Sequence, residues 1–361
     1  MSADDDARFM RRALELARRG WGRVAPNPLV GALVVQEGEV VGEGWHGEYG
    51  RPHAEVEALR AAGEAARGAT VYVSLEPCSH HGQTPPCTDA LLLAGVARVV
   101  YAAADPNPKA RGGAALLRAA GLAVQGGVEE AEARELNAPF FHHFTPAGAR
   151  RPWVELKLAL SLDARLADHT GRSAWLTGEA ARAEVHRQRG AHDAIAVGIG
   201  TVLADDPQLT VRGEVAPRRP PARVVFDRRL RLPLHSRLLR TADEAPVWVV
   251  CGPNAPAEAA RELEARGVRL LRAEALGEAL AALREAGIGA LYCEGGATLA
   301  GAFLSAGAVD RLQLFYAPLL LGADAVSPFA AVARTSIAEV QRWRLLESRR
   351  FGDDTLITLA P

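Results

Sequence analysis

Two neighbouring segments, HAEVEAL at residues 53–59 and EPCSHHGQTPPC at residues 76–87, contain side chains that bind transition metals. The first segment holds His53 and Glu55, and the second holds Cys78 and Cys87, each directly after a proline. The β-branched run ATVYVSLEP, residues 69–77, lies between the histidine and the cysteines and predicts a strand that stops at its proline. A helix, a strand and a loop therefore have to bring one histidine and two cysteines together.

Charge and composition limit what the 361-residue chain can bind. Lys and Arg total 42 against 43 Asp and Glu, so no overall positive field exists to hold nucleic acid or an anionic membrane surface. The N-terminus is acidic, and the sequence contains no apolar run of about 18 residues. We therefore expect a cytoplasmic, homo-oligomeric protein that acts on a small molecule, with no nucleic-acid or membrane partner.

The four cysteines and the two lysines indicate what chemistry these side chains can perform. Four cysteines in so long a chain do not make a disulfide framework, and Cys251 and Cys293 stand alone, so we expect reduced thiols. Only Lys109 and Lys157 are lysine among the 42 basic residues. A lysine in so arginine-rich a chain is retained either by chance or for its chemistry.

The first 145 residues alternate between helical and strand patterns. DDDARFMRRALELARRG, residues 4–20, predicts an amphipathic opening helix with acidic residues in its first turn. GALVVQEGEVVGEG, residues 31–44, predicts a hairpin that turns at Glu37 and Gly38. The βα units that follow predict a mostly parallel sheet covered by helices.

A second α/β series follows the Pro/Gly/Arg segment FTPAGARRP, residues 144–152, which we interpret as a linker between domains 1–145 and 150–361. In WVELKLALSLD, residues 153–163, the leucines from Leu156 to Leu162 share one strand face, and Lys157 projects from the other. In DAIAVGIG, residues 193–200, small residues form one smooth strand face. Either a flat cofactor or a packed helix could cover that face.

His53, Cys78 and Cys87 are the ligand types of a catalytic zinc site, in which three protein ligands leave one position for water. Glu55 has the spacing to His53 that a zinc deaminase needs for its proton-carrying glutamate. A helix cap with two buried cysteines is the plainer alternative, but two Pro-Cys pairs after a His-x-Glu make it improbable. A structural zinc with His80 or His81 as a fourth ligand stays open.

The eight residues between the cysteines differ from the PCxxC spacing of nucleobase deaminases, including tRNA adenosine deaminases. Together with PNPLVGALVV, DPNPKARGGA and GRSAWLTG, the segment resembles a family of bifunctional riboflavin-biosynthesis enzymes. These join a diaminohydroxyphosphoribosylaminopyrimidine deaminase to a 5-amino-6-(5-phosphoribosylamino)uracil reductase. The resemblance implies a cytidine-deaminase-like α/β/α domain followed by a dihydrofolate-reductase-like α/β domain, with one zinc ion per chain and NADPH as cofactors.

The resemblance also implies residue roles. Glu55 would carry protons. Lys157 projects from its strand beside Ala159, where the family places NADPH, so we expect its ammonium in the reductase cleft. Contacts to NADPH would come from Ala159, Trp175, Thr201, Asp205, Gly296, Ala297, Thr298, Leu299, Ala300, Gly301 and Ala302. Contacts to substrate would come from Asn27, His46, His80, Asp105, Asn107, Ser173, Arg189, Leu209, Arg212 and Glu294.

Two positions depart from the family pattern. Gln83 stands where relatives often carry a basic residue, and Ala164 stands where they commonly have glycine. The expected activity is zinc-dependent hydrolysis of the 2-amino group of 2,5-diamino-6-ribosylamino-4(3H)-pyrimidinone 5′-phosphate. NADPH-dependent reduction of the ribosyl group would then give 5-amino-6-ribitylamino-uracil 5′-phosphate. A non-enzymatic module that binds nucleotide beside a structural zinc is the alternative, and ammonia release distinguishes the two.

Overall fold

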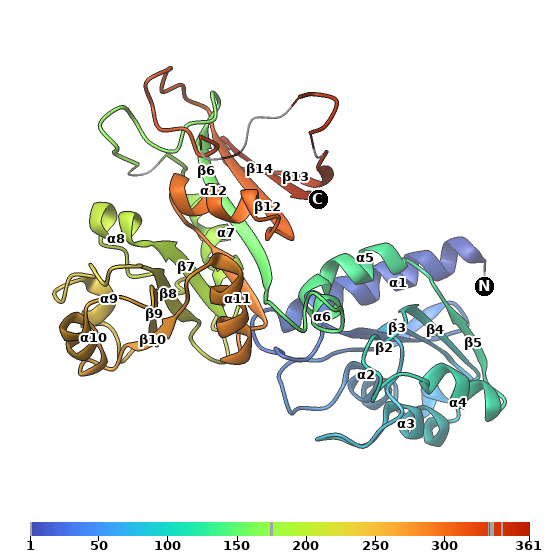
Figure 1. Ribbon diagram of the computed structural model, residues 1–361. Helices are drawn as coiled ribbons and strands as arrows, with labels where there is room; N and C mark the ends of the chain where they lie inside the picture. Colours follow the sequence, from blue (N-terminus) through green and yellow to red (C-terminus); the bar gives the residue numbers. More distant parts are fainter. Residues whose placement is uncertain (1, 174–175, 331, 333–335, 341) are drawn as a thin grey trace. The chain divides into compact units, whose positions relative to one another are not determined.

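The computed structural model describes residues 2–173, 176–330, 332, 336–340 and 342–361. The chain divides into two compact units, which we call unit 1 (residues 1–145) and unit 2 (residues 146–361). Figure 1 shows the order of their helices and strands along the chain. Among the helices of the described residues, none combines the length and apolar character needed to cross a bilayer.

In its described residues, unit 1 contains a five-stranded sheet in the order β2-β1-β3-β4-β5. Its strands are β1 (Gly31–Gln36), β2 (Glu39–Trp45), β3 (Thr70–Leu75), β4 (Arg98–Ala103) and β5 (Ala123–Gly126). β1 is antiparallel to both β2 and β3, whereas β3, β4 and β5 are parallel. The predicted hairpin is confirmed, but the sheet is mixed and not mostly parallel, because the hairpin inserts β1 between β2 and β3.

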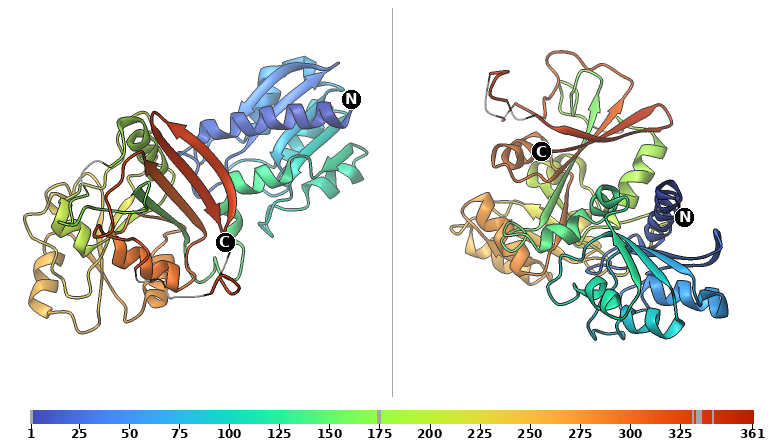
Figure 2. Two further views of the ribbon diagram at one scale, coloured as in Figure 1. Left: turned by 90° about the horizontal axis from the view of Figure 1, so that it is seen from above. Right: turned by 90° about the vertical axis from the view of Figure 1, so that its right-hand side faces the viewer.

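Six α-helices of unit 1 accompany this sheet among the described residues. They are α1 (Ala3–Ala17), α2 (Ala54–Ala62), α3 (Cys87–Ala94), α4 (Gly113–Ala119), α5 (Glu130–Leu136) and α6 (Ala138–His143). Ser2 caps α1 through a hydrogen bond to the backbone N–H of Asp5, so the acidic first turn predicted from the sequence is where the helix begins. Figure 2 shows α1 lying along one face of the sheet.

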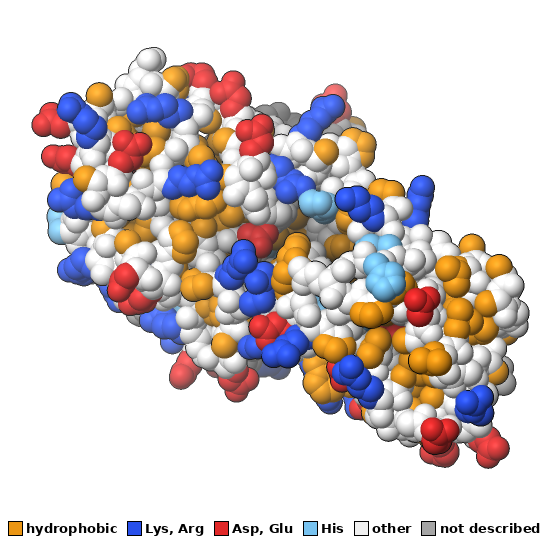
Figure 3. Space-filling view, turned by 90° about the horizontal axis from the view of Figure 1, so that it is seen from below, with side chains coloured by type: hydrophobic (Ala, Val, Ile, Leu, Met, Phe, Trp, Pro, Cys, Tyr) orange, Lys and Arg blue, Asp and Glu red, His pale blue; other side chains and the backbone are white. Residues whose placement is uncertain are grey.

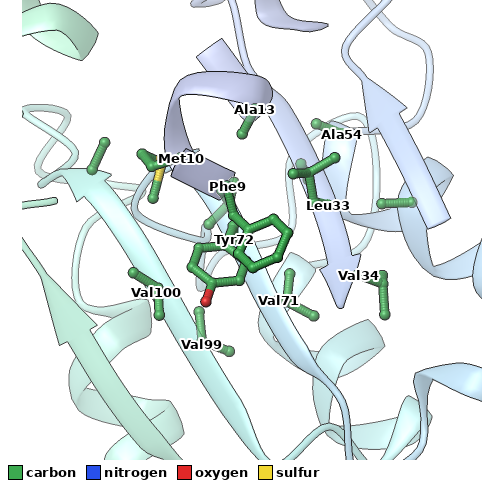
Figure 4. Packing of buried hydrophobic residues seen from close by; sticks show 14 of the residues in the cluster. Phe9, Met10, Ala13, Leu33, Val34, Ala54, Val71, Tyr72, Val99 and Val100 are labelled. Carbon is green, nitrogen blue, oxygen red and sulfur yellow. The ribbon is translucent and has the colours of Figure 1, made fainter. Parts of the chain in front are cut away.

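A buried ion pair and an aromatic contact fix α1 on the sheet. Asp6 accepts hydrogen bonds from Arg98 at 2.6 and 2.9 Å and from the Tyr72 hydroxyl at 2.7 Å. The Phe9 ring lies 5.2 Å from the ring of Tyr72, and Figure 4 shows both among the aliphatic side chains of the core. Because a buried carboxylate is costly unless paired, loss of Arg98 would leave Asp6 as an uncompensated charge.

In its described residues, unit 2 contains a nine-stranded sheet in the order β10-β9-β8-β7-β11-β6-β12-β14-β13. Its strands are β6 (Trp153–Ser161), β7 (Ala194–Gly198), β8 (Ala222–Phe226), β9 (Val247–Cys251), β10 (Arg269–Arg272), β11 (Ala290–Cys293), β12 (Arg311–Ala317), β13 (Arg344–Phe351) and β14 (Asp354–Ala360). The seven strands from β10 to β12 are parallel, and β14 and β13 add an antiparallel edge.

Helices cover both faces of this sheet. They are α7 (Glu179–Arg189), α8 (Ile199–Asp205), α9 (Arg237–Arg240), α10 (Ala257–Glu264), α11 (Leu276–Glu285) and α12 (Ala297–Ser305). One face of β6, with Leu156, Leu158 and Leu160, packs in a cluster with residues of α11 and α12. This confirms the predicted leucine face except at Leu162, which follows the strand and is 59% exposed.

The smooth face of β7 is covered by a helix. Ala194 and Ala196 have no exposed surface and belong to the same buried cluster as Leu299 and Ala300 of α12. The sequence pattern extended the strand to residue 200, but β7 ends at Gly198 and the next residue begins α8. The alternation of small and larger apolar residues therefore continues beyond β7 into the first residues of α8.

Ala164 adopts the left-handed conformation that favours glycine, with φ of 57°. This conformation costs a residue with a Cβ atom about 1–2 kcal/mol, and part of the gain from glycine is offset by the greater freedom of the unfolded chain. We expect Ala164→Gly to raise the free energy of unfolding of unit 2 by about 0.5–1 kcal/mol, measured by urea denaturation. Ala282→Gly, inside α11, should lower it by about 1 kcal/mol. A destabilising Ala164→Gly would show that the methyl contacts outweigh the strain.

Candidate active sites

Three elements of unit 1 bring the predicted metal ligands together. His53 is the N-cap residue of α2, Cys78 lies in the loop after β3, and Cys87 is the first residue of α3. The ligand atoms of these three residues all lie within 4.8 Å of one another. The helix starts orient partial positive charge towards the site, which favours thiolate over thiol.

The His53 ring presents Nδ1 to both sulfur atoms. Nδ1 lies 3.2 Å from Cys87 Sγ and 3.6 Å from Cys78 Sγ, while Nε2 lies 3.4 Å from Thr84 Oγ1. The hydrogen bond from Cys87 lowers the pKa of Cys78, and Cys78 in turn raises the pKa of His53. This donor set suits zinc, and Thr84 occupies the second ring nitrogen as an orienting partner.

Within the described residues, the metal-ligand cluster contains only these three side chains. His80, the proposed fourth ligand of a structural site, lies in the wall of the adjoining cavity, and His81 is exposed. Three protein ligands are the usual number for a catalytic zinc, because the remaining position accepts water. The arrangement therefore favours the catalytic over the structural interpretation.

A cavity of about 240 Å³ adjoins the ligand cluster. Glu55 lies in its wall and is 3% exposed, and burial raises the pKa of its carboxyl despite the opposing charge of His53. A carboxyl with a raised pKa holds and releases a proton closer to neutral pH, as general acid–base catalysis requires. The geometry places a proton carrier beside the metal ligands.

The five substrate-binding residues predicted in unit 1 all line this cavity: Asn27, His46, His80, Asp105 and Asn107. Asn27 Nδ2 lies 3.1 Å from His46 Nε2, and the other ring nitrogen of His46 lies 3.1 Å from the Pro52 carbonyl. Burial lowers the pKa of His46, and burial raises the pKa of Asp105 to about 6. Hydrogen-bond donors and acceptors can thus meet the edge of a heterocycle.

Sequence reasoning missed Glu76, which precedes the first Pro-Cys pair. Its carboxylate accepts hydrogen bonds from the backbone N–H groups of Asp105, Gly112 and Ala114, at 3.0–3.3 Å. Glu76 therefore joins the loop of a zinc ligand to the loop that carries Asp105 and Asn107. A buried acid at the end of an apolar strand was the signal available in the sequence.

Unit 2 places Lys157 in a cluster of charged residues. Cys293 pairs with Leu156, so the next residue of the chain after β11, Glu294, runs beside Lys157 of β6. Arg189, the last residue of α7, donates two hydrogen bonds to the Glu294 carboxylate at 2.5 and 3.0 Å. Burial lowers the pKa of Lys157, although Glu294 opposes the shift. A desolvated ammonium with a lowered pKa is a better proton donor than an exposed one.

The predicted NADPH-contact residues differ in how much of their surface a ligand could reach. Thr201 and Gly296 come close enough that a Cβ atom on Gly296 would lie 3.3 Å from Thr201 Oγ1. Ala297, Thr298 and Ala302 keep exposed surface, and Ala159 is half-buried. Leu299, Ala300 and Gly301 are buried on the inner side of α12, so within this stretch the first turn of the helix and Ala302 have exposed surface.

The substrate contacts predicted in unit 2 differ in their burial and in their hydrogen bonds. Ser173 Oγ is 3.4 Å from the Asp205 carboxylate, and the Arg189 guanidinium also bonds the Thr210 carbonyl at 3.0 Å. Leu209 is buried with φ of 54°, whereas Arg212 is exposed. Trp175 lies outside the described residues.

Comparison with known proteins assigns each unit to a family. Residues 152–357 match the RibD C-terminal domain, and residues 3–103 match the cytidine and deoxycytidylate deaminase zinc-binding region. The riboflavin biosynthesis protein RibD of Aquifex aeolicus is 43% identical over 360 residues, covering 99% of both chains. That of Bacillus amyloliquefaciens is 41% identical, covering 98% of this chain and 95% of the relative.

Solved structures agree with these matches. The structure of Acinetobacter baumannii RibD, form 1, superposes with a TM-score of 0.87 at 41% identity, over 100% of this chain and 99% of the other. The deaminase/reductase of Thermotoga maritima superposes with a TM-score of 0.85 at 34% identity, over 99% of each chain.

The ligand cluster predicts a specific loss of metal. Cys87→Ser keeps nearly the same volume but replaces a thiolate with a hydroxyl that does not ionise at neutral pH. We expect its zinc affinity to fall more than about 100-fold. Replacing only the hydrogen-bond partners of metal ligands already lowers metal affinity by about 10- to 100-fold. Metal analysis after dialysis against a zinc buffer measures this, with Cys251→Ala as the control that keeps its zinc. Full zinc occupancy in Cys87→Ser would contradict the ligand assignment.

Proposed function

The chain belongs to the RibD family, whose members are bifunctional deaminases and reductases of riboflavin biosynthesis, and from this premise we propose how its own residues carry out the two reactions. Residues 1–145 form the deaminase domain and residues 150–361 the reductase domain. The deaminase removes the 2-amino group of 2,5-diamino-6-ribosylamino-4(3H)-pyrimidinone 5′-phosphate. The reductase then converts the ribosyl group to ribityl with NADPH.

The observation that carries the first half of this proposal is the cluster of His53, Cys78 and Cys87 beside Glu55 in one cavity. A zinc ion held by the three ligands would supply a Lewis acid that lets water ionise near neutral pH. Glu55 would accept a proton from the attacking water and deliver a proton to the leaving amine. The pyrimidine is held so that its amino-bearing carbon faces Glu55. Five side chains hold it: Asn27, His46, His80, Asp105 and Asn107.

The second half rests on Lys157, Glu294 and Arg189. NADPH would supply the hydride, bound at the start of α12 and by Thr201, where backbone N–H groups at a helix start suit a phosphate. Arg189 holds the Glu294 carboxylate, and the ammonium of Lys157 donates a hydrogen bond to an oxygen of the ribosyl group. Ser173, Leu209 and Arg212 complete the substrate contacts.

The substrate of this enzyme is a small molecule, and the charge distribution is consistent with that. On the face shown in Figure 3, Lys and Arg side chains lie among Asp and Glu side chains. Interspersed charges do not form the continuous basic stripe that holds a nucleic-acid backbone. A cytoplasmic location and a homo-oligomeric state complete the proposal.

Replacing Glu55 separates this proposal from a nucleotide-binding module with a structural zinc. The wild-type chain should release ammonia from the diaminopyrimidinone phosphate and oxidise NADPH. Glu55→Gln should lower ammonia release by about 100-fold or more, because the proton carrier is lost, while zinc content and reduction of supplied deaminated substrate stay unchanged. Coupled assays of ammonia and of NADPH absorbance measure both. Loss of the two activities together would assign Glu55 to the fold instead.

Lys157 should not tolerate its conservative replacement. A compact ammonium fits beside a sugar oxygen where a planar guanidinium is too wide. Lys157→Arg and Lys157→Ala should each lower reductase kcat/KM by at least about tenfold, equivalent to about 1.4 kcal/mol, with deamination unchanged. Lys109→Arg, in unit 1, is the matched control and should reduce substrate at the wild-type rate. A wild-type kcat/KM in the Lys157→Arg variant would remove Lys157 from the site.

A further inference from the structure

The cavity of unit 1 is lined by more carboxyl groups than lysine or arginine side chains. The substrate of the proposed deaminase carries a 5′-phosphate, and this inference rests on that proposed function. Gln83 lines the cavity but bears no charge. Glu55, Glu76 and Asp105 place three carboxyl groups in the same wall. A phosphate dianion there requires a positive charge from another position.

Arg51 is the one lysine or arginine among the described residues that line the cavity. It lies in the loop between β2 and α2, two residues before the zinc ligand His53. The side chain is exposed, and the described residues give its guanidinium no hydrogen bond or ion pair. Arg23, in contrast, is held by Glu48 at 2.6 Å. The Arg51 guanidinium therefore keeps its donors for a ligand.

The loop of Arg51 and the loop of Gln83 are in contact, and both line the cavity. Gln83 Nε2 donates a hydrogen bond of 2.8 Å to the Tyr49 hydroxyl. A Cβ atom on Gly50, whose φ is +83°, would lie 2.9 Å from Gln83 Oε1. Because the two loops are this close, a cation at position 51 can serve the same phosphate as a cation at position 83.

We propose that Arg51 binds the 5′-phosphate of the deaminase substrate. Glu55 and Cys87 are buried, whereas Arg51 is exposed, so a pyrimidine that reaches Glu55 leaves its ribosyl phosphate towards the mouth. The guanidinium fork matches a phosphate in bidentate geometry. Tyr49 and Gln83 hold the Arg51 loop in place.

Deaminase kinetics on the full-length, zinc-loaded enzyme test this assignment with two substrates, the 5′-phosphate and its dephosphorylated ribosyl form. Arg51→Gln should raise KM for the phosphate by at least about tenfold with little change in kcat, as expected for loss of charged hydrogen bonds. KM for the dephosphorylated substrate should stay the same. Arg60→Gln, on the exposed face of α2, is the matched control and should leave both values unchanged. Adding Gln83→Arg to Arg51→Gln should restore tight binding of the phosphate.

Two results would overturn the assignment. One is an unchanged KM for the phosphate in Arg51→Gln, and the other is an equal loss on both substrates, which would show a structural effect of Arg51. Unchanged zinc content and reductase activity in Arg51→Gln establish that the variant is folded. A wild-type enzyme that releases no ammonia would instead remove the proposed deaminase function itself.

Discussion

The carboxylate of Glu76 ties together two segments of unit 1 that carry predicted site residues. It follows β3 directly, and it accepts three backbone hydrogen bonds from the segment that runs from the end of β4 into the first turn of α4. The carboxyl ends of parallel strands meet at one edge of a sheet, and there the backbone groups of loops need partners. Glu76 supplies them, so the loop of Cys78, a predicted zinc ligand, and the loop of Asp105, a predicted substrate contact, are held by the same side chain.

In unit 2, a buried carboxylate is neutralised by an arginine side chain. Glu294 leaves the end of β11 into a buried region, where an unpaired carboxylate would be costly. Arg189 neutralises it with a two-point contact, and this pairing leaves the ammonium of Lys157 near a carboxylate whose own charge is already engaged. Lys157 therefore lies beside a charge pair that is already bonded, which is consistent with the role that we propose for it in the reductase.

The sequence predicted what depends on local pattern and spacing. The hairpin at Glu37, the opening helix and the leucine face of β6 follow from periodicity, and His53 with the two Pro-Cys pairs follows from ligand chemistry. The mixed sheet was missed, because which strand the hairpin joins is decided by non-local packing. The start of α8 at Ile199 was missed because an apolar alternation looks the same in a strand and in the turn after it. Arg51 and Glu76 carry no local pattern, and only the cavity distinguishes them from other charged residues.

An arginine-rich composition makes the few lysines informative. Arginine serves wherever a planar fork is useful in this chain, as Arg98 does on Asp6 and Arg189 does on Glu294. Those contacts need two donors in one plane, which an ammonium does not provide. The position beside Glu294 on β6 is different, because it is desolvated, has the Phe315 ring 5.9 Å away, and faces a carboxylate whose oxygens are already bonded. A compact ammonium fits position 157 better than a planar guanidinium does. The arginine-rich composition and the packing around β6 therefore both indicate a specific reason for a lysine there.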